Sequence, residues 1–202
     1  MPDQAIRHIA FLAFPGLTLL DLVGAYDPLR RVAPMGIDRD VTVRVIGTKA
    51  SIEDETGLTI VPDGVYEDLK RFDLLVVPGG AGTRRLQHDE RLLEYLRGWG
   101  SGRALASVCT GALLLGSAGL LKRKRATTHH LALDELAPHC REVVRGERIV
   151  EDGVVVTAGG VASALDLGLY LVERYWGAAA RERIGAVMEY PPPAAGPVAA
   201  GP

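Results

Sequence analysis

The sequence predicts an α/β fold in which a mostly parallel sheet carries helices on both faces. Stretches with strand character alternate along the chain with stretches of helical spacing, which is the pattern of such sheets. Residues 8–14 (HIAFLAF) and 72–80 (FDLLVVPGG) contain nearly continuous apolar runs, as expected of strands that are buried on both faces. Both runs stop at proline and glycine, where a parallel sheet collects its functional groups.

Local patterns identify the elements of the first half of the chain. Pro15-Gly16 ends the first strand, and Pro28 is expected to bend or end early the helix that follows. Alternating residues indicate the second strand, and Thr56-Gly57 marks the turn of a small hairpin. The expected elements are a strand at 8–14, a helix at 17–32, a strand at 41–47, a hairpin at 51–63 and a strand at 72–80.

The second half continues the alternation and ends in a tail. Its expected elements are a helix at 89–99, a strand at 103–108, an extended piece at 125–130, a helix at 131–136, short strands within 141–160 that turn at 151–153, and helices at 162–176 and 178–189. The tail at 191–202 (PPPAAGPVAAGP) has no pattern that could bury a face, so we expect it to be extended or disordered. We therefore expect one domain over residues 1–190.

Composition excludes several classes of function. The chain of 202 residues has a net charge of −2, which gives no overall attraction to nucleic acid or to anionic membranes. Residues 122–125 (KRKR) are better explained as a solvated turn than as a nucleic-acid patch. No apolar run approaches the ~18 residues that a membrane span requires. Two cysteines do not form a disulfide framework, and nothing before Arg7 resembles a signal peptide, so a cytoplasmic protein is expected.

Cys109 lies where a strand passes directly into a helix. The small residues Ser107 and Gly111 flank it at two positions before and after, as a sharp turn that exposes a nucleophile requires. The start of a helix stabilises negative charge, so the thiol is expected to lose its proton more easily than a free one. The backbone N–H of Thr110 is placed to stabilise charge on an attacked substrate. The alternative is a buried structural cysteine. Cys140 has no comparable setting.

Asp21 is the candidate proton partner of this thiol. It interrupts an apolar turn just after the first strand, where an unpaired carboxyl is costly to bury unless it is neutralised or hydrogen-bonded. If Asp21 faces Cys109, burial and the neighbouring thiolate would favour the protonated form of the Asp21 carboxyl, which could then donate a proton. The alternative is a helix cap or a solvent-facing acid. His129 or His130 could also approach the thiol, although the spacing does not prove contact.

The sequence also bears on two further kinds of site, a dinucleotide site and a metal site. The pairs Gly79-Gly80 and Gly159-Gly160 lack the Gly-x-Gly-x-x-Gly order of a dinucleotide site and instead leave backbone open for a small ligand. A metal held by Cys109, Asp21 and a histidine has no local ligand motif in its favour. We therefore expect a small-molecule substrate and no cofactor.

Several segments together resemble the ThiJ/PfpI superfamily and, within it, the isocyanide hydratases. The segments are AFPGLTLLDLVGAYDPL (13–29), DLLVVPGGAGT (73–83), SVCTGALLLGSAGLLKRKRATTH (107–129), GGVASALDLGL (159–169) and MEYPPP (188–193). The resemblance implies a flavodoxin-like sandwich that forms a homodimer, with each active site near the subunit contact. In that branch a cysteine attacks the isocyanide carbon to give a thioimidate, and water then releases an N-formamide.

The resemblance also assigns roles. Cys109 would be the nucleophile, Asp21 the acid/base, and Thr110 a contributor to binding. Backbone at Gly79-Gly80 and Gly159-Gly160 would line the pocket together with His129. Aspartate, as here, is the acid of the isocyanide hydratases, whereas many other members of the superfamily have glutamate.

The sequence departs from the pattern at two places, which bear on the shape of the pocket. His130 replaces an aromatic residue, and Val161-Ala162-Ser163 lacks the threonine of the usual GGIT. No DNA-binding helix-turn-helix is expected. Alternatives are a glyoxalase- or deglycase-like enzyme, which more often uses glutamate, and a non-catalytic sensor based on Cys109. An amidotransferase would need a histidine later than His139, and a PfpI-like protease would need one in place of Thr110.

Overall fold

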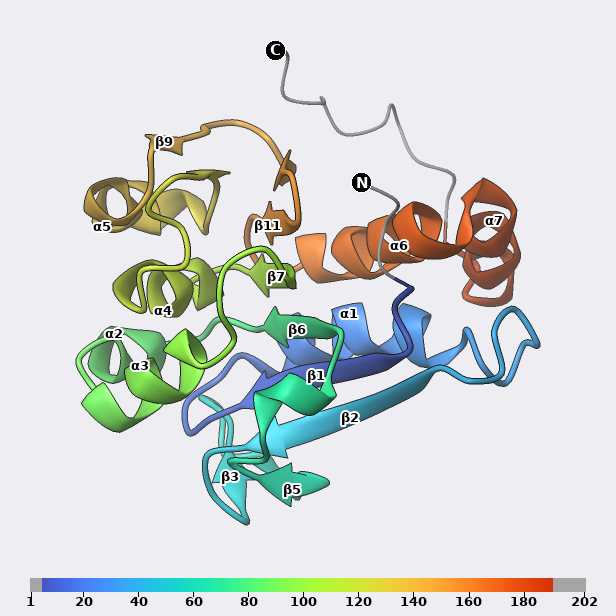
Figure 1. Cartoon of the computed structure of the whole chain (residues 1–202), viewed down its shortest axis with the longest axis horizontal. Helices are drawn as coiled ribbons and strands as arrows, with labels where there is room; N and C mark the ends of the chain where they lie inside the picture. The colour runs from blue at the N-terminus through green and yellow to red at the C-terminus, as the bar shows by residue number, and fades with distance from the viewer. Residues whose placement is uncertain (1–4, 191–202) are drawn as a thin grey trace.

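The computed structural model describes residues 5–190 and confirms the doubly wound α/β fold, with a flavodoxin-like arrangement of helices about a mostly parallel sheet (Figure 1). All neighbouring strands of the central sheet are parallel except the pair at one edge, β10 and β11. Across the sheet the order is β10 (Ile149–Asp152), β11 (Val155–Ala158), β7 (Ala104–Val108), β6 (Leu74–Val77), β1 (His8–Ala13), β2 (Thr42–Gly47) and β5 (Gly64–Val65).

Two small sheets stand beside the central one. The predicted hairpin is formed by β3 (Ile52–Glu53) and β4 (Thr59–Ile60), which pair antiparallel around the turn at Thr56-Gly57. The second sheet joins β8 (Arg125–Ala126) to β9 (Glu142–Val143) in parallel. The hairpin packs next to the first βα turn, because the Gly16 N–H donates to the carbonyl of Glu53 at 2.8 Å.

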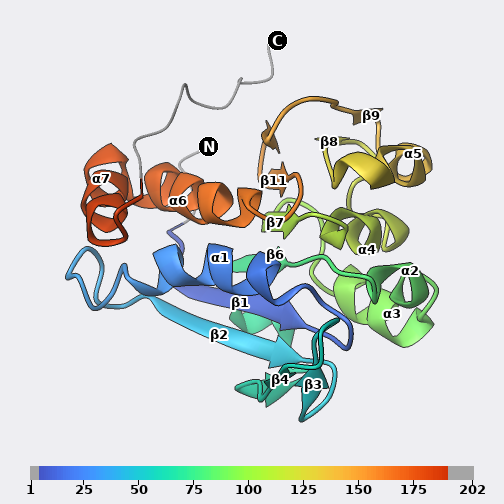
Figure 2. The same cartoon turned by 180° about the vertical axis from the view of Figure 1, so that it is seen from behind.

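Helices cover both faces of the central sheet. Figures 1 and 2 show α1 beside α6, apart from the group formed by α2, α3 and α4. The pair α1 and α6 approaches closely, since a Cβ added at Gly24 would lie 2.7 Å from the Cβ of Ala164. The α-helices are α1 (Leu19–Arg30), α2 (Thr83–Leu86), α3 (Glu90–Arg97), α4 (Gly111–Ser117), α5 (Leu133–Leu136), α6 (Ser163–Trp176) and α7 (Ala178–Val187). The 3₁₀ helices are Leu69–Arg71, His130–Ala132 and Ala137–His139.

The burial of the strands agrees with the sequence pattern. Residues 9–14 and 74–77 are completely inaccessible to solvent, as strands covered on both faces must be. Within residues 5–190, none of the helices combines the length and the apolar character that crossing a bilayer would require.

Several predicted boundaries move. The first helix ends at Arg30, with Pro28 in its last turn, rather than at residue 32. The strand predicted at 72–80 stops at Val77, because Pro78 and the glycines after it turn the chain. The helix predicted at 131–136 is instead a run of short 3₁₀ and α turns, and α2 was not predicted. The tail at 191–202 lies outside the described residues.

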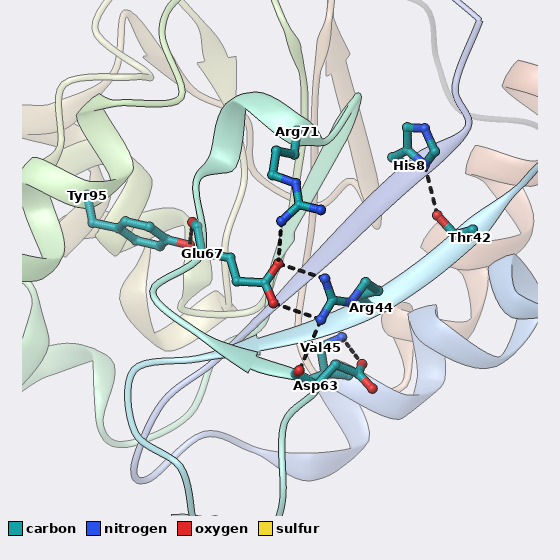
Figure 3. A network of polar contacts seen from close by, with 8 residues as sticks. All are labelled: His8, Thr42, Arg44, Val45, Asp63, Glu67, Arg71 and Tyr95. Atoms are coloured by element: carbon teal, nitrogen blue, oxygen red, sulfur yellow. Dashed lines mark hydrogen bonds and ion pairs between the residues drawn. The ribbon is translucent and has the colours of Figure 1, made fainter.

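A polar network joins β2 to the segment that contains the edge strand β5 (Figure 3). The guanidinium of Arg44 binds both carboxylate oxygens of Glu67, at 2.6 and 2.7 Å. The Asp63 carboxylate accepts from the Val45 N–H at 2.7 Å, and the Tyr95 hydroxyl donates to the Glu67 carbonyl at 2.7 Å. These bonds supplement the two-residue ladder that joins the short strand β5 to β2.

Candidate active site

Cys109 occupies a strained turn between β7 and α4. Its φ angle is +53°, a left-handed conformation that costs a residue with a side chain about 1–2 kcal/mol. The turn requires a glycine two residues later, because a Cβ at Gly111 would lie 2.7 Å from the carbonyl oxygen of Pro78. The structure thus has the strand-to-helix elbow that the small flanking residues predicted.

Hydrogen bonds from two other segments hold this turn. The Cys109 N–H is shared between the carbonyls of Ala158 and Gly159, each at 3.0 Å. The carbonyl oxygen of Cys109 accepts from the hydroxyl of Thr128 at 2.7 Å. Both polar groups of the cysteine backbone are therefore bound to residues outside its own turn, and this stabilises the unusual conformation.

Asp21 lies in the first turn of α1 and is completely buried. Its Oδ2 accepts from the Gly79 N–H at 3.0 Å. A Cβ added to Gly79 would be 2.8 Å from that oxygen, 2.8 Å from the Cβ of Cys109 and 2.6 Å from the nitrogen of Thr110. The carboxyl group and the cysteine therefore meet around Gly79, as predicted, and only a glycine leaves room for both.

Burial governs the protonation of Asp21. It raises the pKa of the carboxyl from 3.8 to about 7, against the opposing effects of the Gly79 N–H and the Cys109 thiol, while the charge of Glu55 raises it slightly further. The second oxygen, Oδ1, is buried without a hydrogen-bond partner of ordinary geometry among residues 5–190. At neutral pH the group is therefore poised to hold or release a proton.

The expectation of an acidic thiol is wrong for the resting protein. Burial first, and the negative charge of Asp21 second, raise the pKa of Cys109 to about 12, although the N–H of Thr110 opposes them. The favourable effect of the start of α4 is smaller than the cost of burying Cys109, which is only 6 % exposed. Cys109 and Asp21 thus titrate as one coupled pair, in which the first proton leaves near neutral pH and the thiol keeps the second.

Thr110 joins the cysteine to the loop after β6. Its hydroxyl accepts from the Gly80 N–H at 3.0 Å and lies 3.2 Å from the Gly80 carbonyl. Its backbone N–H favours the charged form of the Cys109 thiol. Gly80 has a φ of +130° and has no space for a side chain, because an added Cβ would lie 2.5 Å from the Gly16 carbonyl oxygen.

His129 stands at the side of the site rather than on the thiol. No hydrogen bond joins it to Cys109 among the described residues; its Nδ1 accepts from the Leu131 N–H at 3.3 Å. Its ring lies against Gly160, where an added Cβ would be 3.1 Å from Nε2. Burial, His130 and Arg84 lower its pKa, which favours the neutral ring. The structure therefore places His129 beside the second glycine pair and gives the thiol Asp21 as its partner.

Sequence reasoning missed two residues of this region. Thr128 lies within the segment at 107–129, and nothing in its local pattern shows that it bonds to a carbonyl of another segment. Glu55 lies in an exposed loop, yet its carboxylate reaches the start of α1. Cys140 is separate from the site, with its sulfur 3.7 Å from the Leu136 carbonyl. Within residues 5–190, three or more His, Cys, Asp or Glu side chains nowhere gather as a metal site would need.

Comparison with known proteins identifies the family. A model described as the DJ-1/PfpI family matches residues 7–174. The chain belongs to the DJ-1/PfpI family. It is 37% identical over 187 residues to an isonitrile hydratase from Pseudomonas putida, a match that covers 92% of this chain and 79% of the relative.

Other relatives in the family have different names. The chain is 30% identical to the transcriptional regulator CdhR of Pseudomonas aeruginosa over 83% of its length, and 29% identical to the DJ-1 homolog A of Arabidopsis thaliana over 87%. It spans 50% and 47% of those two proteins, so about half of each has no counterpart in the match. Membership of the family is therefore compatible with both enzymes and regulators.

Solved structures agree on the fold. A ThiJ/PfpI family protein from Pseudomonas syringae superposes with a TM-score of 0.82 at 30% identity, covering 96% of this chain and 84% of the other. The DJ-1beta protein of Drosophila melanogaster superposes with a TM-score of 0.78 at 21% identity, covering 93% of this chain and 100% of the other. The second likeness concerns the fold alone.

Proposed function

We propose that the protein is an isocyanide hydratase, which adds water to an isocyanide to give an N-formamide. The observation that carries the proposal is the buried pairing of Asp21 with Cys109 around Gly79, in which an aspartate with a pKa of about 7 adjoins a protonated thiol. The 37% identity to an isonitrile hydratase over most of both chains supports the same reaction.

The state of the pair suits the first step. The terminal carbon of an isocyanide accepts a nucleophile and a proton on the same atom, so the pair must supply one sulfur nucleophile and one proton, and the single proton that Cys109 and Asp21 hold between them at neutral pH meets this need. The Asp21 carboxylate takes the thiol proton of Cys109 as the sulfur bonds to the carbon, and then passes that proton to the carbon. The product is a thioimidate, R–N=CH–S–Cys109, with no leaving group released.

The second step returns the enzyme to its starting state. Water attacks the thioimidate carbon, and Asp21 relays a water proton to the nitrogen. The carbon–sulfur bond then breaks as the C=O bond forms, and the second water proton ends on Cys109. The sum is isocyanide plus water to N-formamide. The Thr110 N–H, which favours a charged sulfur, stabilises Cys109 as it accepts or leaves the carbon.

The same features weigh against the other readings. The cysteine of a redox sensor is oxidised as a thiolate. A thiol with a pKa of about 12 has only a small thiolate fraction at neutral pH. A glyoxalase- or deglycase-like enzyme would act on a carbonyl carbon, and that branch of the superfamily more often uses a glutamate near the cysteine, whereas the acid here is Asp21. We propose, in addition, a cytoplasmic homodimer whose backbone at Gly79-Gly80 and Gly159-Gly160, with His129, lines the substrate pocket.

The test offers the purified full chain two substrates side by side. We expect an alkyl isocyanide to be converted to its formamide over many turnovers, and methylglyoxal to remain unconsumed. Formamide release can be followed by chromatography and isocyanide loss by absorbance. A single reaction that modifies Cys109 and then stops would identify a sensor, and steady loss of methylglyoxal would identify a carbonyl enzyme; either would overturn the proposal.

A further inference from the structure

Glu55 lies in the loop between β3 and β4 and spans two segments that hold Asp21. One carboxylate oxygen accepts from the Thr18 hydroxyl at 2.6 Å, and the other accepts from the Ala81 N–H at 3.1 Å. Thr18 is the residue before α1, which carries Asp21, whereas Ala81 follows the glycine pair that binds the Asp21 carboxyl. The Glu55 side chain therefore connects the start of α1, which carries Asp21, to the loop after β6, which binds the Asp21 carboxyl group.

The surrounding backbone shows that this junction is tight. The Thr18 N–H donates to the Gly79 carbonyl at 2.9 Å, and the Gly82 N–H donates to the Gly16 carbonyl at 2.9 Å. The loop of Glu55 is itself anchored, because its N–H donates to the Leu17 carbonyl at 3.0 Å. The hydroxyl of Thr18 serves this junction rather than the helix, since it caps no backbone N–H of α1.

We propose that Glu55 is a positioning residue for Asp21, which fixes the carboxyl group against Cys109 by clamping the start of α1 to the loop after β6. The proposal rests on the assigned roles of Asp21 and Cys109. Glu55 acts through these bonds and touches no reacting atom. Its own charge has a second effect at the same place, which provides a readout that a merely structural role would not give.

The electrostatic effect has a defined sign. Besides burial and the Gly79 N–H, the titratable groups that shift the pKa of Asp21 are Cys109, from the β7–α4 turn, and Glu55, from the hairpin loop. A negative Glu55 disfavours a second negative charge and so keeps the proton on Asp21 to higher pH. Removing that charge will let the first proton of the coupled pair leave at lower pH, by about half a pH unit for a solvent-exposed neighbour.

The experiment compares Glu55→Gln with Glu55→Ala in a Cys140→Ser background. The rate of Cys109 alkylation by iodoacetamide is measured against pH by mass spectrometry, and formamide production is measured on the same preparations. In Glu55→Gln, which retains hydrogen bonding, we expect the alkylation profile to move about half a pH unit downward and turnover to stay within about threefold of the background. In Glu55→Ala we expect kcat to fall about tenfold through misplacement of Asp21.

Glu53→Gln is the matched control. It removes the same charge from the same hairpin, but Glu53 meets the first βα turn through its backbone carbonyl and not its carboxyl group. We expect its alkylation profile and turnover to match the background.

An alkylation profile of Glu55→Gln that coincides with that of Glu53→Gln would overturn the proposal, and so would full turnover by Glu55→Ala. The alkylation profile requires no isocyanide. A chain that fails to hydrate isocyanides would therefore refute the proposed function while still testing the role of Glu55.

Discussion

The buried position of Asp21 raises its pKa into the range where it can exchange a proton, and this lowers the stability of the folded chain at neutral pH. The carboxyl is fully buried and one of its oxygens lacks a partner among the described residues, so ionising it inside the protein is unfavourable. The folded chain keeps the Asp21 proton up to about pH 7, whereas an unfolded chain releases it near 3.8. Between these values the folded state binds more protons, and its stability falls as pH rises.

Asp21→Asn will therefore stabilise the protein while removing its acid. At pH 8 we expect the free energy of unfolding to exceed that of the wild type by a few kcal/mol, because the variant buries no charge. At about pH 4 the two should be similar, since both side chains are then neutral. Urea unfolding at several pH values measures the difference. A difference that stays constant from pH 4 to pH 8 would contradict the assigned burial of a titrating carboxyl.

Paired side chains add to the ladder bonds that hold the short strand β5 in place. The segment that contains β5 is fixed to β2 by the bidentate pair of Arg44 and Glu67, whose side chains are 34% and 19% exposed. The pair is separated from the Cys109 turn by β6 and β1 in the sheet. It should contribute to stability and not to the reaction.

A double-mutant cycle with Arg44→Met and Glu67→Gln tests this division. We expect a coupling energy of about 1 kcal/mol, because the pair is bidentate and partly shielded from solvent. The comparison pair, Arg145 and Asp134, is 60% and 93% exposed and should give a coupling near zero. Thermal or urea unfolding provides the energies. Equal coupling in the two pairs, or a loss of turnover in the folded Arg44→Met variant, would contradict the account.

The elements differ in how far the sequence reveals them. Strands such as β1 and β6 are continuous apolar runs, and their punctuation by proline and glycine is visible in the sequence. The two residues of β5 and the four of α2 are too short to show a period, and they exist because of contacts with distant segments. Boundaries fail for a related reason: Pro28 is accommodated in the last turn of α1, which nothing local indicates.

The topology of the central sheet assembles the candidate site. Parallel strands bring the ends of β1, β6, β7 and β11 to one edge of the sheet, so Asp21, Gly79 and Cys109 could be grouped from the sequence alone. The protonation state of the thiol could not be predicted from the sequence, because it depends on how deeply Cys109 is buried and on how close Asp21 lies to it. The contribution of Glu55 could not be predicted either, because it depends on a long-range contact between the hairpin and the residue before α1.

Formamide production by Cys109→Ala, Asp21→Asn and Cys140→Ala shows whether the buried pair of Cys109 and Asp21 performs the reaction. The three proteins are assayed together with an alkyl isocyanide, after circular dichroism has shown that each is folded. We expect no turnover from the first two, because one lacks the atom that binds the isocyanide carbon and the other lacks the group that moves its proton, and wild-type turnover from the third. Sustained formamide production by folded Cys109→Ala or Asp21→Asn would contradict the account.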